Sequence, residues 1–190
     1  FEPIREFALE ERDRDPGLRE AARYAHAAHY AARAVAFREG PGSAAEREAI
    51  AFEVENLRAA LAASAERAGS AAAAVALALA LDPVLEARGL SRERIAIAAS
   101  SIAAAERDAL PPSSTLAALY VARGRARRLA GELRLAGEDY ASALDIARTA
   151  GCRLEEARSE LWMGELGETE GETVAARGRF ARAESIARAL

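Results

Sequence analysis

The stretch GRARRLAGELRLAGEDYASAL, residues 124–144, has a counterpart 40 residues later in GELGETEGETVAARGRFARAE, residues 164–184. Five positions keep the same chemical type in both copies: two glycines, an alanine, an aromatic residue and a second alanine. They are Gly124, Gly131, Ala136, Tyr140 and Ala143, matched by Gly164, Gly171, Ala176, Phe180 and Ala183. A fixed period of this size is typical of stacked pairs of helices, and it decides the fold that we predict.

The rest of the chain has the composition of a helical protein. Alanine, leucine, glutamate and arginine dominate, and all favour helix, whereas no run alternates β-branched residues as a strand would. Glycine, proline and serine clusters divide the chain into eight segments of about 18 to 25 residues, with a short helix, Ile4–Glu10, in front. Because short connections join antiparallel neighbours, we predict an all-α solenoid of about four antiparallel helical hairpins. Residues 1–110 would hold divergent hairpins and residues 111–190 the two regular repeats, in one continuous array.

Local signals refine this prediction for the first half of the chain. Ser43 and Glu46 form a capping box, opening one helix whose apolar stripe faces the core. That stripe consists of Ile50, Val54, Leu57 and Leu61. The apolar run 71–81 predicts the most enclosed helix, and Asp82-Pro83 predicts a kink or break after it. Such a bend either opens a cleft or is a packing irregularity. Ser91 is expected to cap the next helix.

Charge and composition argue against several classes of partner. All 26 basic residues are arginine, which suits phosphate contacts, but the net charge is −4 and is spread along the chain without a block of one sign. We therefore expect no nucleic-acid partner. We expect no membrane partner, because no run of 18 apolar residues occurs. The single cysteine, Cys152, excludes an internal disulfide and fits a reducing cytoplasm. The start at Phe1, without methionine, suggests a piece of a larger protein.

Catalytic and metal-binding signals are weak. The chain has two histidines and no serine or cysteine near a plausible base. His26 and His29 are three residues apart on a predicted helix, but metal sites need three or four ligands. We therefore predict no enzymatic activity, no metal and no cofactor.

The repeated pattern resembles the tetratricopeptide repeat, in which glycines in the first helix and turn precede alanine, an aromatic residue and alanine in the second. The period is 40 rather than the usual 34, and Arg148 and Arg188 stand where the family has a closing proline. The resemblance implies a concave groove lined by the first helix of each hairpin. The groove residues would be Ala118, Val121, Arg125, Arg128 and Leu129, then Arg158, Leu161, Glu165, Glu168 and Thr169.

A second resemblance concerns two short motifs. FEPIREFALE, residues 1–10, and ENLRAAL, residues 55–61, are similar to segments of multidomain bacterial signalling ATPases of the STAND type, which include transcriptional regulators. In that family the segments lead from a nucleotide-binding domain into helical repeats. The resemblance implies a C-terminal sensor and scaffold region, and no phosphate-binding loop of the Gly-x-x-x-x-Gly-Lys-Ser/Thr type lies in this chain.

Binding is therefore the predicted function. The groove would hold a peptide or another part of the parent protein, with Arg125 and Arg128 contacting carboxylates, unless these charges only solvate the inner face. A small-molecule effector in an apolar cavity near Asp82-Pro83 is the alternative. Trp162 is expected to pack between hairpins rather than to act as an exposed anchor.

Overall fold

The computed structural model describes residues 15–39 and 44–190, which form nine helices and no strand. The predicted all-α class is confirmed for this part of the chain. The expected helix Ile4–Glu10 and the capping residue Ser43 lie outside the described residues. The helices are α2 (Pro16–Glu39), α3 (Ala44–Phe52), α4 (Val54–Glu66), α5 (Ala71–Ala87), α6 (Ser91–Arg107), α7 (Ser114–Leu129), α8 (Leu133–Thr149), α9 (Arg153–Thr169) and α10 (Thr173–Arg188).

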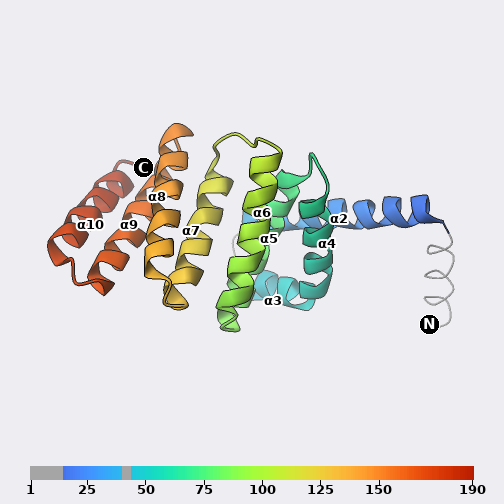
Figure 1. Cartoon of the computed structure of the whole chain (residues 1–190), viewed down its shortest axis with the longest axis horizontal. Helices are drawn as coiled ribbons and strands as arrows, with labels where there is room; N and C mark the ends of the chain where they lie inside the picture. Colours follow the sequence, from blue (N-terminus) through green and yellow to red (C-terminus); the bar gives the residue numbers. More distant parts are fainter. Residues whose placement is uncertain (1–14, 40–43) are drawn as a thin grey trace.

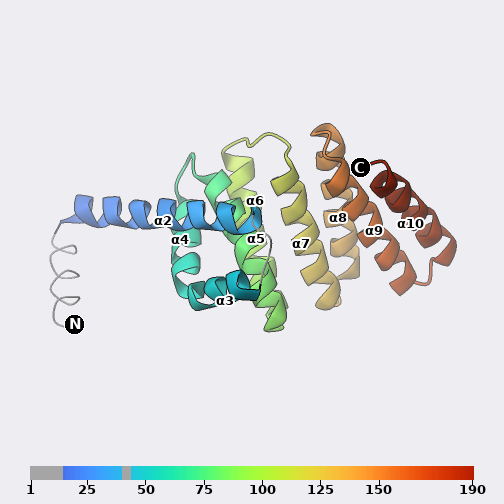
Figure 2. The ribbon, with the colours of Figure 1, turned by 180° about the vertical axis from the view of Figure 1, so that it is seen from behind.

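The helices from α5 to α10 stand side by side in chain order, and each packs on the next (Figure 1). In addition α7 contacts both α5 and α9, so it lies between these two helices along one side of the row. At the other end α2 crosses α4 and α5 instead of running alongside them (Figure 2). The described helices also pack across Pro111-Pro112, because α7 contacts both α5 and α6. The division of the chain into residues 1–110 and 111–190 stays a prediction.

Two of the repeated glycines reverse the chain after α7 and α9. Gly131 and Gly171 both have φ of +82°, a conformation that side chains other than glycine rarely adopt. At each turn the amide of the following residue bonds back into the last helical turn, from Glu132 to the Arg127 carbonyl and from Glu172 to the Gly167 carbonyl. These bonds satisfy carbonyls that the helix end would leave open. The two copies of the repeat therefore end their first helix in the same type of turn.

The other repeated glycine lies beneath an aromatic ring of the same helix pair. A Cβ atom placed on Gly124 would lie 2.5 Å from Cε1 of Tyr140, and one placed on Gly164 would lie 2.6 Å from Cε1 of Phe180. Such distances are far inside van der Waals contact. The glycine of the first helix therefore makes room for the ring of the second helix.

The helix expected to run through residues 50–61 is interrupted at Glu53, which separates α3 from α4. The carboxylate of Glu53 accepts hydrogen bonds from the Tyr30 hydroxyl at 2.9 Å and the Asn56 side-chain amide at 2.6 Å, and Arg33 donates a third. The bonds from Tyr30 and Arg33 hold the carboxylate against α2. The three bonds also lower the pKa of Glu53, and the bond from Asn56 contributes most to this shift. The single-helix prediction was wrong because these tertiary contacts compete with helical continuity. The predicted core stripe on both helices is nevertheless buried.

The predicted break at Asp82-Pro83 is absent, and α5 continues through Pro83 to Ala87. Asp82 accepts two hydrogen bonds from the buried Arg94 of α6, at 2.7 and 3.0 Å, while Val84 and Leu85 remain in the core. These anchors on both sides of the proline offset the loss of one helical hydrogen bond. The run 71–81 is largely enclosed, as predicted.

The start of α6 also differs from the expectation. Ser91 is the first helical residue rather than the cap, and Leu90 precedes it without a side-chain capping bond. Among the described residues, no helix combines the length and apolar character needed to cross a bilayer.

Candidate functional site

The ten residues predicted to line a groove lie on two neighbouring helices, α7 and α9, which contact each other. On α7, Val121 is buried, Ala118, Arg125 and Arg128 are half-buried, and Leu129 is 58% exposed. On α9, Glu165 is half-buried, and the other four residues are exposed. These four are Arg158, Leu161, Glu168 and Thr169. The structure therefore brings the two sets to adjacent helices.

Arg125 joins three helices. Its guanidinium forms an ion pair with Glu86 of α5 and lies 4.7 Å from the ring centroid of Trp162 of α9. Glu86 also lies 3.4 Å from the guanidinium of Arg94, which is itself held by Asp82. Arg125 is thus already satisfied by a carboxylate of its own chain. Its contact with a carboxylate of a partner would require breaking this pair.

Arg128 has a different environment, one helical turn away. Its guanidinium lies 5.7 Å from the ring centroid of Trp162. Within the described part of the chain it makes no ion pair, and its Nε atom is buried without a hydrogen-bond partner. Beneath it, burial raises the pKa of Tyr140 to about 12, an effect that the positive charge of Arg128 partly opposes. Arg128 therefore brings an uncompensated positive charge to the surface shared by α7 and α9.

The α9 side of the predicted groove, which carries Glu165 and Glu168, is more open to solvent than the α7 side. Arg158 pairs with Glu155 of its own helix at 2.7 Å, and the Thr169 hydroxyl donates to the Glu165 carbonyl at 2.9 Å. Glu168 is exposed. These residues follow one helix and do not converge on a common point. Nothing in this half resembles a preformed acidic site.

Trp162 and Glu86 are the residues of this face that the repeat pattern did not select. Trp162 is half-buried and packs against a core cluster formed by Ala136, Tyr140 and Leu166, so it lies between helix pairs as predicted. It also keeps part of its ring at the surface under two arginines. Glu86 belongs to α5, a helix without the repeat signature, and no sequence signal could have placed it beside Arg125.

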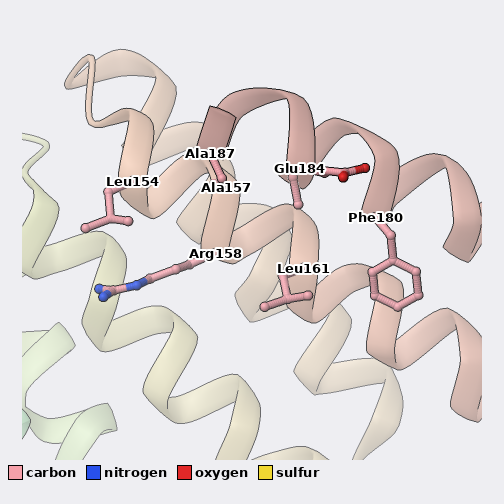
Figure 3. A pocket seen from close by; sticks show the side chains of 8 residues that line it. Leu154, Ala157, Arg158, Leu161, Phe180, Glu184 and Ala187 are labelled. Carbon is pink, nitrogen blue, oxygen red and sulfur yellow. The ribbon is translucent and has the colours of Figure 1, made fainter. Parts of the chain in front are cut away.

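A hollow of about 350 Å³ lies between α9 and α10 (Figure 3). Its walls are apolar apart from Arg158 of α9 and Glu184 of α10. The lining residues are Leu154, Ala157, Arg158 and Leu161 of α9 with Phe180, Ala183, Glu184 and Ala187 of α10. Two of the predicted groove residues, Arg158 and Leu161, therefore also belong to this second surface.

A hollow of about 340 Å³ lies next to Pro83 of α5, in the region of the predicted effector cavity. Phe37 of α2 and Ala51 of α3 form its apolar walls with Val84, and Arg88 and Glu48 provide its charged groups. It is formed by packing between helices, because α5 does not break at the proline.

The histidines and the cysteine, the candidates for metal binding and catalysis, do not form a common site. His26 and His29 both pack their rings near Tyr30, at centroid distances of 4.7 and 5.0 Å. Cys152 is half-buried, and its Sγ atom lies 3.6 Å from the Ala150 carbonyl oxygen. Residues 15–39 and 44–190 contain no cluster of three or more potential metal ligands.

No protein-family model matches the chain, and no curated protein matches it at a significant level. The function is therefore argued from the sequence pattern and from the geometry described above.

Proposed function

We propose that this chain is a non-catalytic interaction scaffold, a TPR-like array of helical hairpins that binds a peptide or protein segment on the face of α5, α7 and α9. Three facts support this proposal: the 40-residue repeat, the glycine and aromatic pairs within each copy, and the contacts of α7 with both α5 and α9. Helical arrays of this kind use such extended faces for binding.

The observation that carries the proposal is the pairing of Arg128 with Trp162. A tryptophan and an arginine are the side chains most enriched where binding energy is concentrated. Here Trp162 is half-buried and fixed by core contacts, and Arg128 lies over it without a carboxylate partner among the described residues. The bound segment would place a carboxylate on Arg128 and an apolar side chain against Trp162 and Leu129. Arg125 contributes by holding the ring, because Glu86 already neutralises it.

We also propose that the parent protein is a bacterial regulatory ATPase or transcriptional regulator. The support is the resemblance of residues 1–10 and 55–61. In the second motif, Leu57, Ala60 and Leu61 are buried, and Asn56 holds Glu53 at the junction of α3 and α4. The motif is thus a core element, and a phosphate-binding loop encoded upstream of Phe1 would test the assignment.

Selection from a library of short random peptides on the immobilised 190-residue chain tests the binding face. We expect enrichment of sequences that combine acidic and apolar residues, and a Kd at least about tenfold weaker for Arg128→Glu, because a charge-assisted hydrogen bond contributes about 1.5–3 kcal/mol. Arg134→Glu is the matched control, since Arg134 is an exposed arginine on α8. Equal binding by both variants, or no enriched sequence, would reject the proposal.

The effector-sensing alternative rests on the hollow beside Pro83. Its volume lies within the range of small-ligand sites, about 300–1,000 Å³, and its walls are mainly apolar. A small molecule that raises the melting temperature of the wild-type chain but not of Val84→Trp would favour this alternative. Peptide binding that is insensitive to Val84→Trp would favour the α5–α7–α9 face.

A further inference from the structure

Glu86 of α5 is the carboxylate that neutralises Arg125, and a second arginine also holds it in place. The oxygen that forms the ion pair with Arg125 lies 3.4 Å from a guanidinium nitrogen of Arg94. Arg94 is buried and donates two hydrogen bonds to Asp82, so it cannot move away from Glu86. The side chain of Glu86 is nevertheless 30% exposed. Its carboxylate is therefore fixed in position and still faces the surface on which Arg125 lies.

This pairing makes two otherwise similar arginines different. Arg125 and Arg128 are one turn apart on α7, and both guanidinium groups lie over the ring of Trp162, at 4.7 and 5.7 Å from its centroid. Side chains spaced in this way are neighbours on a helix surface. Without Glu86, the face would offer two positive charges to two carboxylates of a bound segment. With Glu86, only the charge of Arg128 is left without a carboxylate among the described residues.

The energetic consequence differs between the two positions. A carboxylate of a bound segment that reached Arg125 would have to replace Glu86, and it would lie close to the displaced carboxylate. A hydrogen bond to a charged group contributes about 1.5–3 kcal/mol, so the exchange loses about as much as it gains. The repulsion between like charges adds to the cost. At Arg128 no such pair has to be broken, so a carboxylate there adds to the affinity.

We propose that Glu86 is a specificity-determining residue of the binding face, because it restricts the charge that this face recognises to a single carboxylate on Arg128. This inference rests on the function proposed above. The preferred partner is then a mainly apolar segment with one acidic residue at the contact. A segment with a second carboxylate one turn away gains no advantage, so an acidic tract is not the preferred partner.

The test starts from the peptide most enriched by selection on the wild-type 190-residue chain. Every other position of this parent peptide is replaced in turn by glutamate, and the Kd of each fluorescent derivative is measured by anisotropy. On the wild-type chain we expect no derivative to bind more than about twofold tighter than the parent. On the Glu86→Gln chain at least one derivative should bind about tenfold tighter, because Arg125 is free to form a charge-assisted bond.

Two controls separate a local effect from a change in net charge. Glu138→Gln removes an exposed carboxylate that pairs with Arg134 on α8, so it changes the net charge by the same amount. Its glutamate derivatives should rank as they do on the wild-type chain. Adding Arg125→Gln to Glu86→Gln should abolish the tenfold gain, because the second carboxylate then has no cation to contact.

A second measurement needs no change at Glu86. In the otherwise wild-type chain, Arg128→Gln should weaken binding of the parent peptide about tenfold, and Arg125→Gln less than about threefold. Circular dichroism and thermal unfolding check that each variant is folded. Glu86→Gln itself should remain folded, because Arg94 keeps both of its hydrogen bonds to Asp82.

The possible results separate this inference from the binding-face proposal. If no peptide binds the wild-type chain in a manner that depends on Arg128, both fail. If such a peptide binds but its glutamate derivatives rank equally on the wild-type and Glu86→Gln chains, only the role of Glu86 is rejected. A gain on Glu86→Gln that persists without Arg125, or equal losses for Arg125→Gln and Arg128→Gln, would also overturn it.

Discussion

The helix pairs α7–α8 and α9–α10 carry the same pattern in different surroundings. In both, a glycine of the first helix accommodates an aromatic ring of the second, so this contact depends only on residues within the pair. Burial differs, because Tyr140 is fully enclosed under α9 whereas Phe180 is half-exposed beside an open hollow. The comparison separates what a repeat encodes by itself from what its neighbour supplies.

Buried charges also differ between the two helix pairs, and mutating them should have the largest effect on the free energy of unfolding. Asp139 of α8 is 2% exposed and pairs with Arg123 and Arg127, whose side chains are also largely enclosed. Asp139→Ala should lower the free energy of unfolding by about 3 kcal/mol, because it leaves two cations without their shared carboxylate. At the equivalent position, Arg179→Ala should cost about 1 kcal/mol, because the buried Glu160 with which it pairs keeps Arg148 and Arg182 as partners.

Urea denaturation measures both free energies. The matched control is Glu138→Ala, which removes an exposed pair with Arg134 and should cost less than about 0.5 kcal/mol. Equal losses for Asp139→Ala and Arg179→Ala would contradict the view that the neighbouring helix sets the energy of these charges.

The two glycines give the next largest effect. Gly124→Ala should destabilise by about 2 kcal/mol, because the added methyl meets the enclosed ring of Tyr140. Gly164→Ala should cost less than about 1 kcal/mol, because Phe180 has open space to move into and alanine favours helix by about 1 kcal/mol. Thermal unfolding of both variants tests the order, and a larger loss at Gly164 would show that the open pair is not the more adaptable one.

The smallest change in stability at neutral pH is expected when the aromatic residues of the two pairs, Tyr140 and Phe180, are exchanged for each other's type. The Tyr140 hydroxyl is buried and has no hydrogen-bond partner among the described residues, so Tyr140→Phe should change stability by less than about 0.5 kcal/mol near pH 7. The difference should grow in alkali. Burial raises the pKa of Tyr140 from 10.0 to about 12. The neutral, buried hydroxyl therefore leaves the stability of the wild type unchanged below pH 10, and the wild type loses stability as the pH rises toward 12.

Denaturation between pH 8 and pH 12 checks this slope. Tyr140→Phe should lose less stability than the wild type over that interval. Phe180→Tyr should add only a shallow slope, because position 180 is half-exposed. Parallel curves for the wild type and Tyr140→Phe would show that the enclosed hydroxyl does not couple folding to pH.

Local sequence signals predicted the helices, the turns at Gly131 and Gly171, and the buried stripe from Ile50 to Leu61. They failed where a distant side chain decides the outcome. The break at Glu53 depends on Tyr30 and Arg33 of α2, and the continuity of α5 through Pro83 is supported by Arg94 of α6.

The candidate site shows the same limit. The pattern placed Arg125 and Arg128 on one face, and both guanidinium groups do lie over Trp162. It could not distinguish them, because Arg125 is neutralised by Glu86, a residue of a helix without the repeat signature. Nor could it show that Val121 is covered while its counterpart Leu161 is open, since only the neighbouring helix makes that difference.

The main contacts among α5 to α10 join helices that are adjacent or next but one in the chain. These contacts are therefore local in sequence, which is the topology that folds quickly. It also means that no single nucleus has to assemble distant parts, so order can spread from any helix pair to the next.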